Sequence, residues 1–248
     1  MKQRHHALCI DSDGQRLRAE LAASESGAAI LFVHGWDSDH QHYEDLSDRV
    51  AALGATCLTF DLRGHGRSAA MHAQVNRNDN LNDVLAAYDA LAGWPGVDGS
   101  AIGIVGTSYG GYLAAIATAL RPVRWLALRV PALYPDAQWD VPKTALDRQM
   151  LQAYRKVPQG PDGNRALAAC HAFHGDVLVV ESGEDHVVPH PAVQSFVDAF
   201  ARPRSLTHCT IEGADHALSS APCQRAYAAL VLDWIKARLD QQTVQLVS

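Results

Sequence analysis

Short apolar runs that alternate with helical segments constrain the fold of this chain more than any other feature. The runs predict strands at 28–34, 55–60, 102–105, 125–130 and 177–180, and a further strand is expected at 206–211. Helices are expected at 41–53, 81–94, 109–120, 191–201 and 220–239. A strand buried on both faces needs no polar side, so this pattern is typical of a parallel sheet covered by helices on both faces.

The N-terminal segment 5–22 predicts a hairpin. Two short strands flank Asp13-Gly14, a dipeptide that is typical of a tight turn. The hairpin would extend one edge, giving a mostly parallel central sheet of about eight strands in an α/β fold. The chain has 248 residues, of which 48% are hydrophobic, enough for one large core. We therefore expect a single domain over residues 1–248.

One segment, residues 132–175, interrupts the alternation. Its prolines are Pro135, Pro142, Pro158 and Pro161. A long structureless loop is rare inside a compact domain, so we expect one or two helices that form a small lid. Trp139, Met150 and Tyr154 could line an apolar pocket beneath this lid, although core packing is the commoner role of such residues.

Charge and composition exclude several classes of protein. The formal net charge is −6 and no run of five like charges occurs, so nucleic-acid binding has little support. No 18-residue apolar stretch exists and the start 1–10 lacks the apolar core of a secretory signal, so we expect no membrane partner. The five cysteines form no CxxC pair and HExxH is absent. We therefore expect reduced thiols, a cytoplasmic location and no metal site.

A serine within Gly106-Thr107-Ser108-Tyr109-Gly110 is the candidate nucleophile. The motif G-x-S-x-G marks a sharp turn between a strand and a helix, where the serine hydroxyl projects above the sheet. The expected strand 102–105 and the expected helix 109–120 supply that context. The first N–H groups of the helix would face the site, together with the positive end of the helix dipole.

A serine at its ordinary pKa is a weak nucleophile and needs a neighbouring base. We predict His216, because it follows the last expected strand, at the carboxyl edge where open α/β sheets bind their ligands. His186 is the strongest alternative, because it adjoins the expected acid. The remaining rivals are His171, His174 and His208.

The base in turn needs a carboxylate that orients its ring. We predict Asp185, which follows the expected strand 177–180. Glu184 is the second choice. Asp215 is the third, because side chains of adjacent residues usually diverge and Asp215 precedes the expected base directly.

The oxyanion of the transition state needs hydrogen-bond donors. One expected donor is the backbone N–H of Tyr109, the residue after the nucleophile. The other is the backbone N–H of Trp36, in the loop after strand 28–34. A backbone donor is indifferent to its side chain, so the Trp36 ring is free to shape an acyl pocket or to serve a structural role.

Five short segments in this order resemble the α/β-hydrolase superfamily over nearly the whole chain: 34–36, 61–68, 106–110, 183–189 and 213–216. The sharp turn around Ser108, called the nucleophile elbow, is similar to that of prolyl-oligopeptidase-type serine peptidases. Residues 97–103 before it also resemble those enzymes and dienelactone-hydrolase-type esterases. Those peptidases carry a large extra domain, for which this chain has no room. The resemblance implies an α/β-hydrolase fold, the order Ser108, Asp185, His216, and a structural role for His65 in a glycine-rich turn.

We expect a serine hydrolase that cleaves a small carboxylic ester or a related acyl compound through an acyl-serine intermediate, without a metal or an organic cofactor. A thioesterase, or a peptidase or aminopeptidase, is the alternative on the same fold. An aminopeptidase would need an acidic residue near the site, and the candidates by loop position are Glu44, Asp45, Asp136 and Asp140. A non-catalytic binding protein is a further alternative. The fold alone identifies no substrate.

Overall fold

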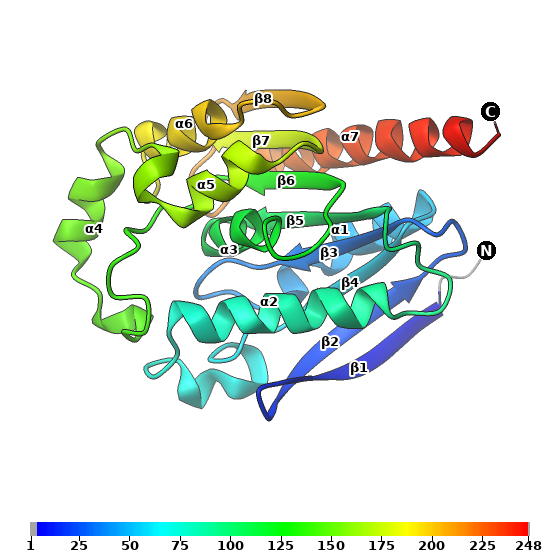
Figure 1. Cartoon of the computed structure of the whole chain (residues 1–248), viewed down its shortest axis with the longest axis horizontal. Coiled ribbons are helices and arrows are strands. Elements are labelled where there is room, and N and C mark those ends of the chain that lie inside the picture. Colours follow the sequence, from blue (N-terminus) through cyan, green and yellow to red (C-terminus); the bar gives the residue numbers. More distant parts are fainter. Residues whose placement is uncertain (1–3, 248) are drawn as a thin grey trace.

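An eight-stranded sheet runs through the middle of the protein, whose computed structural model describes residues 4–247 (Figure 1). Residues 1–3 and 248 of the expected domain 1–248 lie outside the described residues. The strands are β1 (Arg4–Ser12), β2 (Gln15–Ala23), β3 (Ala29–Val33), β4 (Thr56–Phe60), β5 (Ile102–Thr107), β6 (Trp125–Arg129), β7 (Asp176–Ser182) and β8 (Ser205–Ile211).

The strand order across the sheet is β1-β2-β4-β3-β5-β6-β7-β8. The pairs β1–β2 and β2–β4 are antiparallel, and all other neighbouring pairs are parallel. The predicted fold class, a mostly parallel sheet of eight strands in an α/β arrangement, is therefore confirmed.

Burial along the strands explains why they lack a polar face. Every residue of the five strands β3, β4, β5, β6 and β7 is buried. By contrast, β2 mixes buried with more exposed residues, and β8 alternates between half-buried and exposed residues up to the buried Ile211, because both strands lie toward the edges of the sheet. The predicted turn joins β1 to β2, where Asp13 and Gly14 both have positive φ angles, of 52° and 76°.

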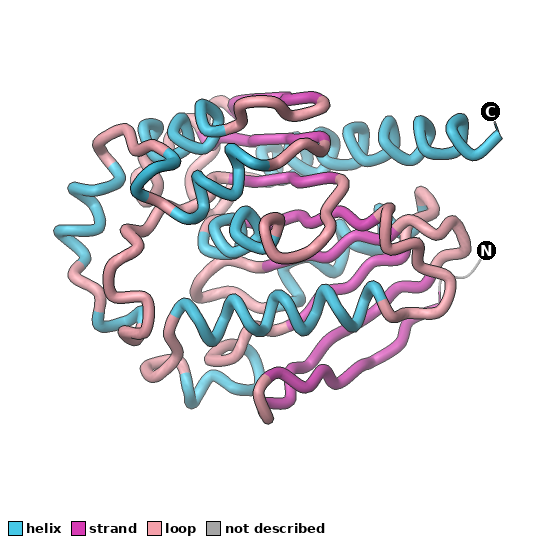
Figure 2. The backbone as a smooth tube through the Cα atoms, in the orientation of Figure 1, coloured by secondary structure: helices cyan, strands magenta, loops and turns pink. Residues whose placement is uncertain are grey.

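Helices cover both faces of the sheet, and each face has its own core (Figures 1 and 2). One core includes residues of α2 (Arg77–Ala92), α3 (Tyr109–Ala117), α5 (Arg165–Ala172) and α6 (His190–Ala199). The other includes residues of α1 (Glu44–Ala52) and α7 (Ala221–Val247). No helix among residues 4–247 is long and apolar enough to span a bilayer.

Two helices begin elsewhere than the apolar spacing suggests. The expected helix 81–94 starts at Arg77, because the Asn76 side chain and Asp79 form a capping box at its N-terminus. The expected helix 41–53 is divided into the short 3₁₀ helix η1 (His40–Tyr43) and α1. The first difference arises from a polar side-chain cap, which apolar spacing does not report, whereas α1 begins after Tyr43 without a side-chain cap.

The segment 132–175 contains η3 (Lys143–Ala145), α4 (Arg148–Arg155), η4 (Pro161–Gly163) and α5. Helix α5 packs against α3 and α6, so it is part of the helical layer over the sheet. Helix α4 lies beyond the end of the sheet, at the left in Figure 1. Met150, on α4, is 72% exposed, so neither of the roles considered for its side chain applies here.

Candidate active site

Ser108 lies at the junction of β5 and α3 and has a strained backbone. Its φ and ψ angles are 53° and −115°, a conformation that residues with a side chain rarely adopt. The Ser108 N–H donates to the carbonyl of Arg129 (2.9 Å), and its own carbonyl accepts from the N–H of Tyr112 (3.1 Å) and of Ala132 (2.9 Å). These bonds to the next strand and the next helix hold the strained turn in place.

Glycines around Ser108 allow the backbones to approach closely. A Cβ on Gly110 would lie 2.3 Å from the carbonyl oxygen of Val33 and 2.4 Å from that of His34. A Cβ on Gly106 would lie 2.7 Å from the carbonyl oxygen of Gly110. Gly110 is therefore required by the packing of this turn against the end of β3, and Gly106 by the close approach of β5 to the start of α3.

The structure brings the three predicted side chains into one hydrogen-bonded row. The Ser108 hydroxyl lies 3.0 Å from Nε2 of His216. On the other side of the ring, Nδ1 of His216 lies 2.6 Å from Oδ2 of Asp185. An ionised carboxylate can only accept, so Nδ1 carries the proton and Nε2 is the acceptor for the serine hydroxyl.

Asp185 is held in its ionised form. Burial opposes ionisation, but the hydrogen bonds from His216 and from the Val188 N–H outweigh it, so the pKa of Asp185 is lowered. The N–H groups of Val187 and Val188 both donate to Oδ1 at 2.8 Å. The loop after β7 therefore fixes both the charge and the orientation of the carboxylate.

A buried arginine holds the loop that carries His216 in place. Arg129, at the end of β6, is 2% exposed and donates from Nη2 to the His216 carbonyl (2.9 Å). Its guanidinium also lies over the ring of Tyr227. Arg129 was not predicted from the sequence, because a charged residue at the end of an apolar run gives no signal of its partner.

The alternative base and acids lie in other surroundings. Glu184 and His186 are exposed. The carboxylate of Asp215 accepts instead from the N–H and the hydroxyl of Ser219, at 2.8 and 2.6 Å. His208 lies 3.4 Å from Glu181. None of these contacts involves Ser108.

The remaining two histidine rivals also lie away from the row. His171 is exposed on α5, and Nδ1 of His174 lies 3.1 Å from the Arg202 carbonyl. Neither ring is placed to accept the Ser108 proton.

The two expected oxyanion donors belong to Tyr109, which follows Ser108 directly, and to Trp36, whose ring contacts the Tyr109 ring. Helical hydrogen bonds in α3 begin with Tyr112, so the N–H of Tyr109 has no acceptor within the helix. Gly35, which precedes Trp36, lies against the nucleophile, since a Cβ on it would be 3.5 Å from Ser108 Cβ. The loop after β3 and the N-terminus of α3 therefore converge at the serine.

The loop after β3 is fixed by a buried neutral histidine. His34 Nε2 accepts from the Leu62 N–H (3.0 Å), and Nδ1 donates to the Gly35 carbonyl (2.7 Å). Burial, reinforced by the nearby His65, lowers the pKa of His34 to about 3. A proton on Nε2 would break the bond to Leu62, so the neutral ring maintains this loop.

Aromatic and basic side chains surround the Trp36 ring. It makes edge-on contacts with His65 and Tyr109, with ring centroids 4.6 and 5.4 Å away. Lys143, from η3, places its ammonium 3.8 Å from the centre of the Trp36 ring. Burial lowers the pKa of Lys143, although the Tyr134 hydroxyl opposes this shift. The segment expected to form the lid therefore reaches the oxyanion loop through a lysine that sequence reasoning did not single out.

Trp139 and Tyr154 take part in packing. Trp139 lies under the guanidinium of Arg165, 3.9 Å from its ring centre, and donates to Asn78 (3.2 Å). The Tyr154 hydroxyl accepts from Asn164 (3.1 Å). These contacts join α4 and the preceding loop to α2 and α5.

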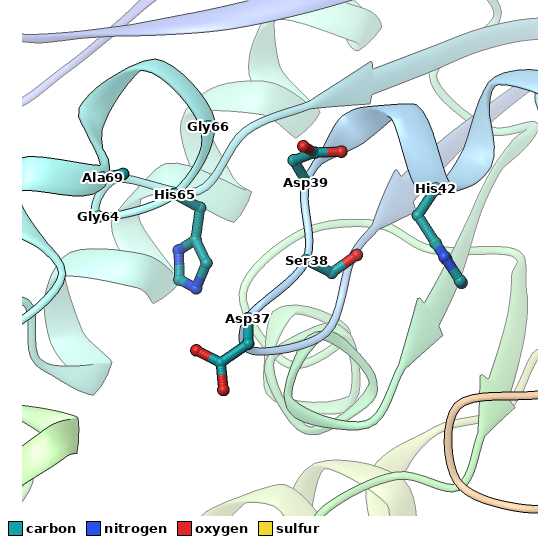
Figure 3. Close-up of a pocket in the computed structure, with 8 residues that line it drawn as sticks. All are labelled: Asp37, Ser38, Asp39, His42, Gly64, His65, Gly66 and Ala69. Carbon is teal, nitrogen blue, oxygen red and sulfur yellow. The ribbon is translucent and has the colours of Figure 1, made fainter. Parts of the chain in front are cut away.

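A pocket of about 580 Å³ opens beside the oxyanion loop. Figure 3 shows that its lining comes from two chain segments, 37–42 after β3 and 64–69 after β4, the second of which enters η2 (Gly66–Met71). His65 lines this pocket and contacts Trp36, while Ser108 and His216 are not among its lining residues. The pocket therefore adjoins the row of three side chains on the Trp36 side.

The strand order, the serine at the elbow after β5, the carboxylate after β7 and the histidine after β8 together define an α/β-hydrolase. The family described as serine aminopeptidase, S33, matches residues 24–160. The chain belongs to this family of the α/β-hydrolase superfamily.

Curated and solved proteins resemble this chain in sequence and in fold. An uncharacterized protein of Mycobacterium tuberculosis (strain H37Rv) is 28% identical over 193 residues, which are 77% of this chain and 63% of the relative. The chain thus spans less than two thirds of that relative's length. The fold is similar to the dienelactone hydrolase of Anabaena variabilis (TM-score 0.69, 18% identity, 94% and 97% of the two chains) and to an esterase of Pyrococcus furiosus (TM-score 0.72, 17% identity, 95% and 91%).

Proposed function

We propose that this protein hydrolyses a small carboxylic ester or a related acyl compound through an acyl-serine intermediate. The observation that carries the proposal is the continuous row from Ser108 Oγ through the His216 ring to Asp185, with distances of 3.0 and 2.6 Å. A nucleophile, a base and an orienting carboxylate in that geometry are what acyl transfer to serine requires.

In the proposed reaction, Ser108 Oγ attacks the substrate carbonyl carbon while His216 Nε2 takes the hydroxyl proton. Asp185 stabilises the imidazolium that forms, and the N–H groups of Trp36 and Tyr109 stabilise the oxyanion. His216 then returns the proton to the leaving alcohol as the bond to carbon breaks. Water attacks the acyl-enzyme with His216 again as the base, which releases the acid and restores the serine.

Of the four acidic residues considered for an aminopeptidase, two are engaged by other residues, which favours an ester over a peptide substrate. An aminopeptidase needs a carboxylate directed at the substrate's amino group. Asp136 instead accepts from the Arg165 N–H (2.9 Å), and Glu44 lies 3.7 Å from His40. Asp45 and Asp140 are exposed. The Pyrococcus furiosus protein of similar fold is described as an esterase, which also favours an ester substrate.

A substrate panel tests this proposal. Values of kcat/KM are compared for esters of graded acyl and alcohol size and for the matching thioesters and aminoacyl amides. We expect the esters to react fastest. Faster turnover of the amides would contradict the esterase proposal and favour an aminopeptidase, and faster turnover of the thioesters would favour a thioesterase.

Two serine variants serve as controls for the panel. Ser108→Ala should lower kcat by about 10⁴-fold or more, because the nucleophile is lost. Ser38→Ala removes a second hydroxyl, in the pocket of Figure 3, and should leave kcat almost unchanged. Persistent turnover in Ser108→Ala would contradict the assigned nucleophile.

A further inference from the structure

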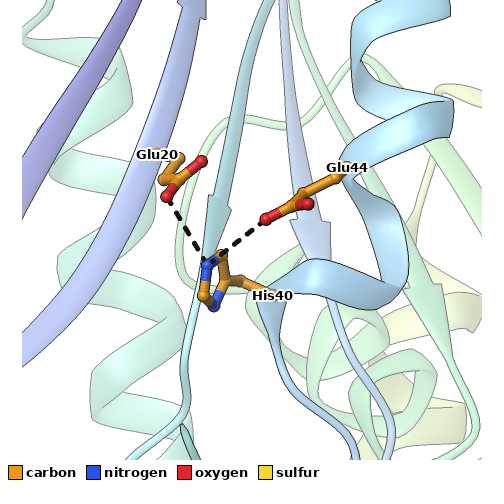
Figure 4. A group of neighbouring side chains, drawn as sticks. All are labelled: Glu20, His40 and Glu44. Carbon is orange, nitrogen blue, oxygen red and sulfur yellow. Dashed lines mark ion pairs between the residues drawn. The ribbon is translucent and has the colours of Figure 1, made fainter. Parts of the chain in front are cut away.

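We propose that Glu20, His40 and Glu44 form a site for a divalent first-row transition ion such as Zn²⁺, away from the Ser108 row. The three side chains come from β2, from η1 and from the first turn of α1 (Figure 4). One oxygen of each carboxylate and one ring nitrogen of the histidine all lie within 4.8 Å of one another. The proposal does not depend on the proposed hydrolase function.

The first observation is the orientation of the His40 ring. Its side chain is 3% exposed, and Nδ1 lies 2.7 Å from Oδ1 of Asp61, which also accepts from the His40 N–H (3.0 Å). A carboxylate on Nδ1 fixes the proton there and leaves the lone pair on Nε2. This carboxylate–histidine pairing is the usual way in which proteins orient a histidine that binds a metal.

The second observation is the environment of Nε2. This nitrogen is buried and has no hydrogen-bond partner among the described residues. It is directed between the two glutamates, with Glu20 Oε1 and Glu44 Oε1 each at 3.7 Å. A lone pair and two carboxylates converge on the same space, and a cation between them would satisfy all three.

The distances are close to those that zinc needs. Zinc binds imidazole nitrogen and carboxylate oxygen at about 2.0–2.2 Å, so two ligand atoms on a tetrahedral ion lie about 3.4 Å apart. Nε2 is 3.7 Å from each carboxylate, so modest side-chain rotation would complete the approach. Glu44 can rotate readily, because its side chain is 48% exposed.

A pocket of about 240 Å³ gives an ion and its water ligands access to the two carboxylates. Its wall includes oxygen-bearing side chains such as Glu20, Glu44 and Asp48, and also His5. One imidazole and two carboxylates with water form a mixed nitrogen and oxygen set, which suits zinc and its first-row neighbours better than Mg²⁺ or Ca²⁺.

Arg18 competes for one of the ligands. Its Nη2 donates to Glu20 Oε1 at 2.8 Å, and the Arg18 side chain is 38% exposed. An exposed ion pair of this kind contributes little to stability, so a bound ion can displace it. Removing Arg18 should therefore tighten metal binding.

The rival explanation is a protonated His40 that forms ion pairs with Asp61, Glu20 and Glu44. That arrangement is electrically satisfied without a metal and would bind none. The two explanations therefore differ in a direct measurement of metal binding.

The experiment titrates Zn²⁺ into chelator-treated protein of residues 1–248, by calorimetry and by native mass spectrometry. We expect the double variant Glu20→Gln/Glu44→Gln to bind one zinc fewer per chain than the wild type. Arg18→Gln should tighten that site by about two- to fivefold. At a zinc concentration 100 times the Kd, the Tm of the wild type should rise by roughly 5–10 °C, and that of the double variant should not.

Two control variants account for zinc that binds elsewhere. Asp45→Asn removes one charge from the same helix at a position that is 87% exposed, and His208→Gln removes a histidine paired with Glu181 on a distant strand. Both should retain the full zinc complement of the wild type. Equal zinc binding by the wild type and the double variant would overturn the proposal, whatever the panel of substrates shows.

Discussion

The hydrogen bond between Asp185 and His216 gives a prediction at the scale of single residues. Asp185→Asn keeps the size of the side chain but no longer stabilises an imidazolium or the required ring tautomer. We expect kcat to fall by about 10⁴-fold, with a circular dichroism spectrum like that of the wild type. Asp215→Asn is the matched control, because Asp215 lies beside His216 in sequence and bonds to Ser219 instead. Equal losses in the two variants would contradict the assignment of the acid.

His34 gives a prediction for the dependence of stability on pH. Its pKa is about 3 in the folded chain, against about 6.5 when unfolded, so the unfolded state binds more protons between these values. The stability due to neutral His34 is thus fully present above pH 6.5 and decreases as the pH falls toward 3, by about 1.4 kcal/mol per pH unit.

Urea unfolding between pH 4 and pH 7 measures this effect. In His34→Gln, the fall in the free energy of unfolding with decreasing pH should be less steep than in the wild type by about that amount. His171→Gln, at an exposed position, is the control for substituting a histidine. Identical slopes in the wild type and His34→Gln would show that His34 is not held neutral.

Local sequence predicted the three residues of the candidate site, but it did not predict the residues that hold the surrounding loops in place. The motif around Ser108 and the positions of Asp185 and His216 after strands suffice to place them at one edge of a parallel sheet. Arg129 and Lys143 contact the same region, but each partner is far away in the chain. Such contacts depend on the folded topology, so spacing along the sequence does not reveal them.

At the scale of elements, the turn from β5 to α3 depends on Gly110. In Gly110→Ala the new Cβ would meet two backbone oxygens of the β3 end at 2.3 and 2.4 Å, so one element must shift. We expect the free energy of unfolding to fall by about 3 kcal/mol or more, measured by urea denaturation. Gly99→Ala, whose Cβ would have nothing within 4 Å, should change it by less than about 0.5 kcal/mol. A Gly110→Ala variant as stable as the wild type would contradict this packing.

The strands were more predictable than the helical ends and the segment 132–175. An apolar run such as 102–105, bounded by turn residues, has the length and composition of a strand that is buried on both faces of the sheet. Its local sequence is therefore enough to predict the strand. Helix ends depend on caps such as Asn76, and α4 is fixed by tertiary bonds. Arg155 on α4 is buried and donates to the carbonyls of Leu133 (3.0 Å) and Val187 (3.3 Å). No periodicity encodes that anchor.

At the scale of the whole molecule, the parallel topology brings the candidate site residues together at the carboxyl edge of the sheet. The parallel strands β3, β5, β7 and β8 all end there, and the loops after them supply Trp36, Ser108, Asp185 and His216. The sequence order of these residues already predicted the α/β-hydrolase topology, because each follows an expected strand. The Glu20, His40 and Glu44 cluster was not predicted, since it depends on the antiparallel pairing of β2 with β4.

Covalent labelling with a fluorophosphonate probe tests the central claim, that Ser108 is an activated nucleophile, most directly. Intact mass and peptide mapping should show one adduct per folded chain, on Ser108, and none in Ser108→Ala. Asp185→Asn should label far more slowly, because its His216 is a poorer base. A folded wild-type protein that forms no adduct, or an adduct on another residue, would contradict the account.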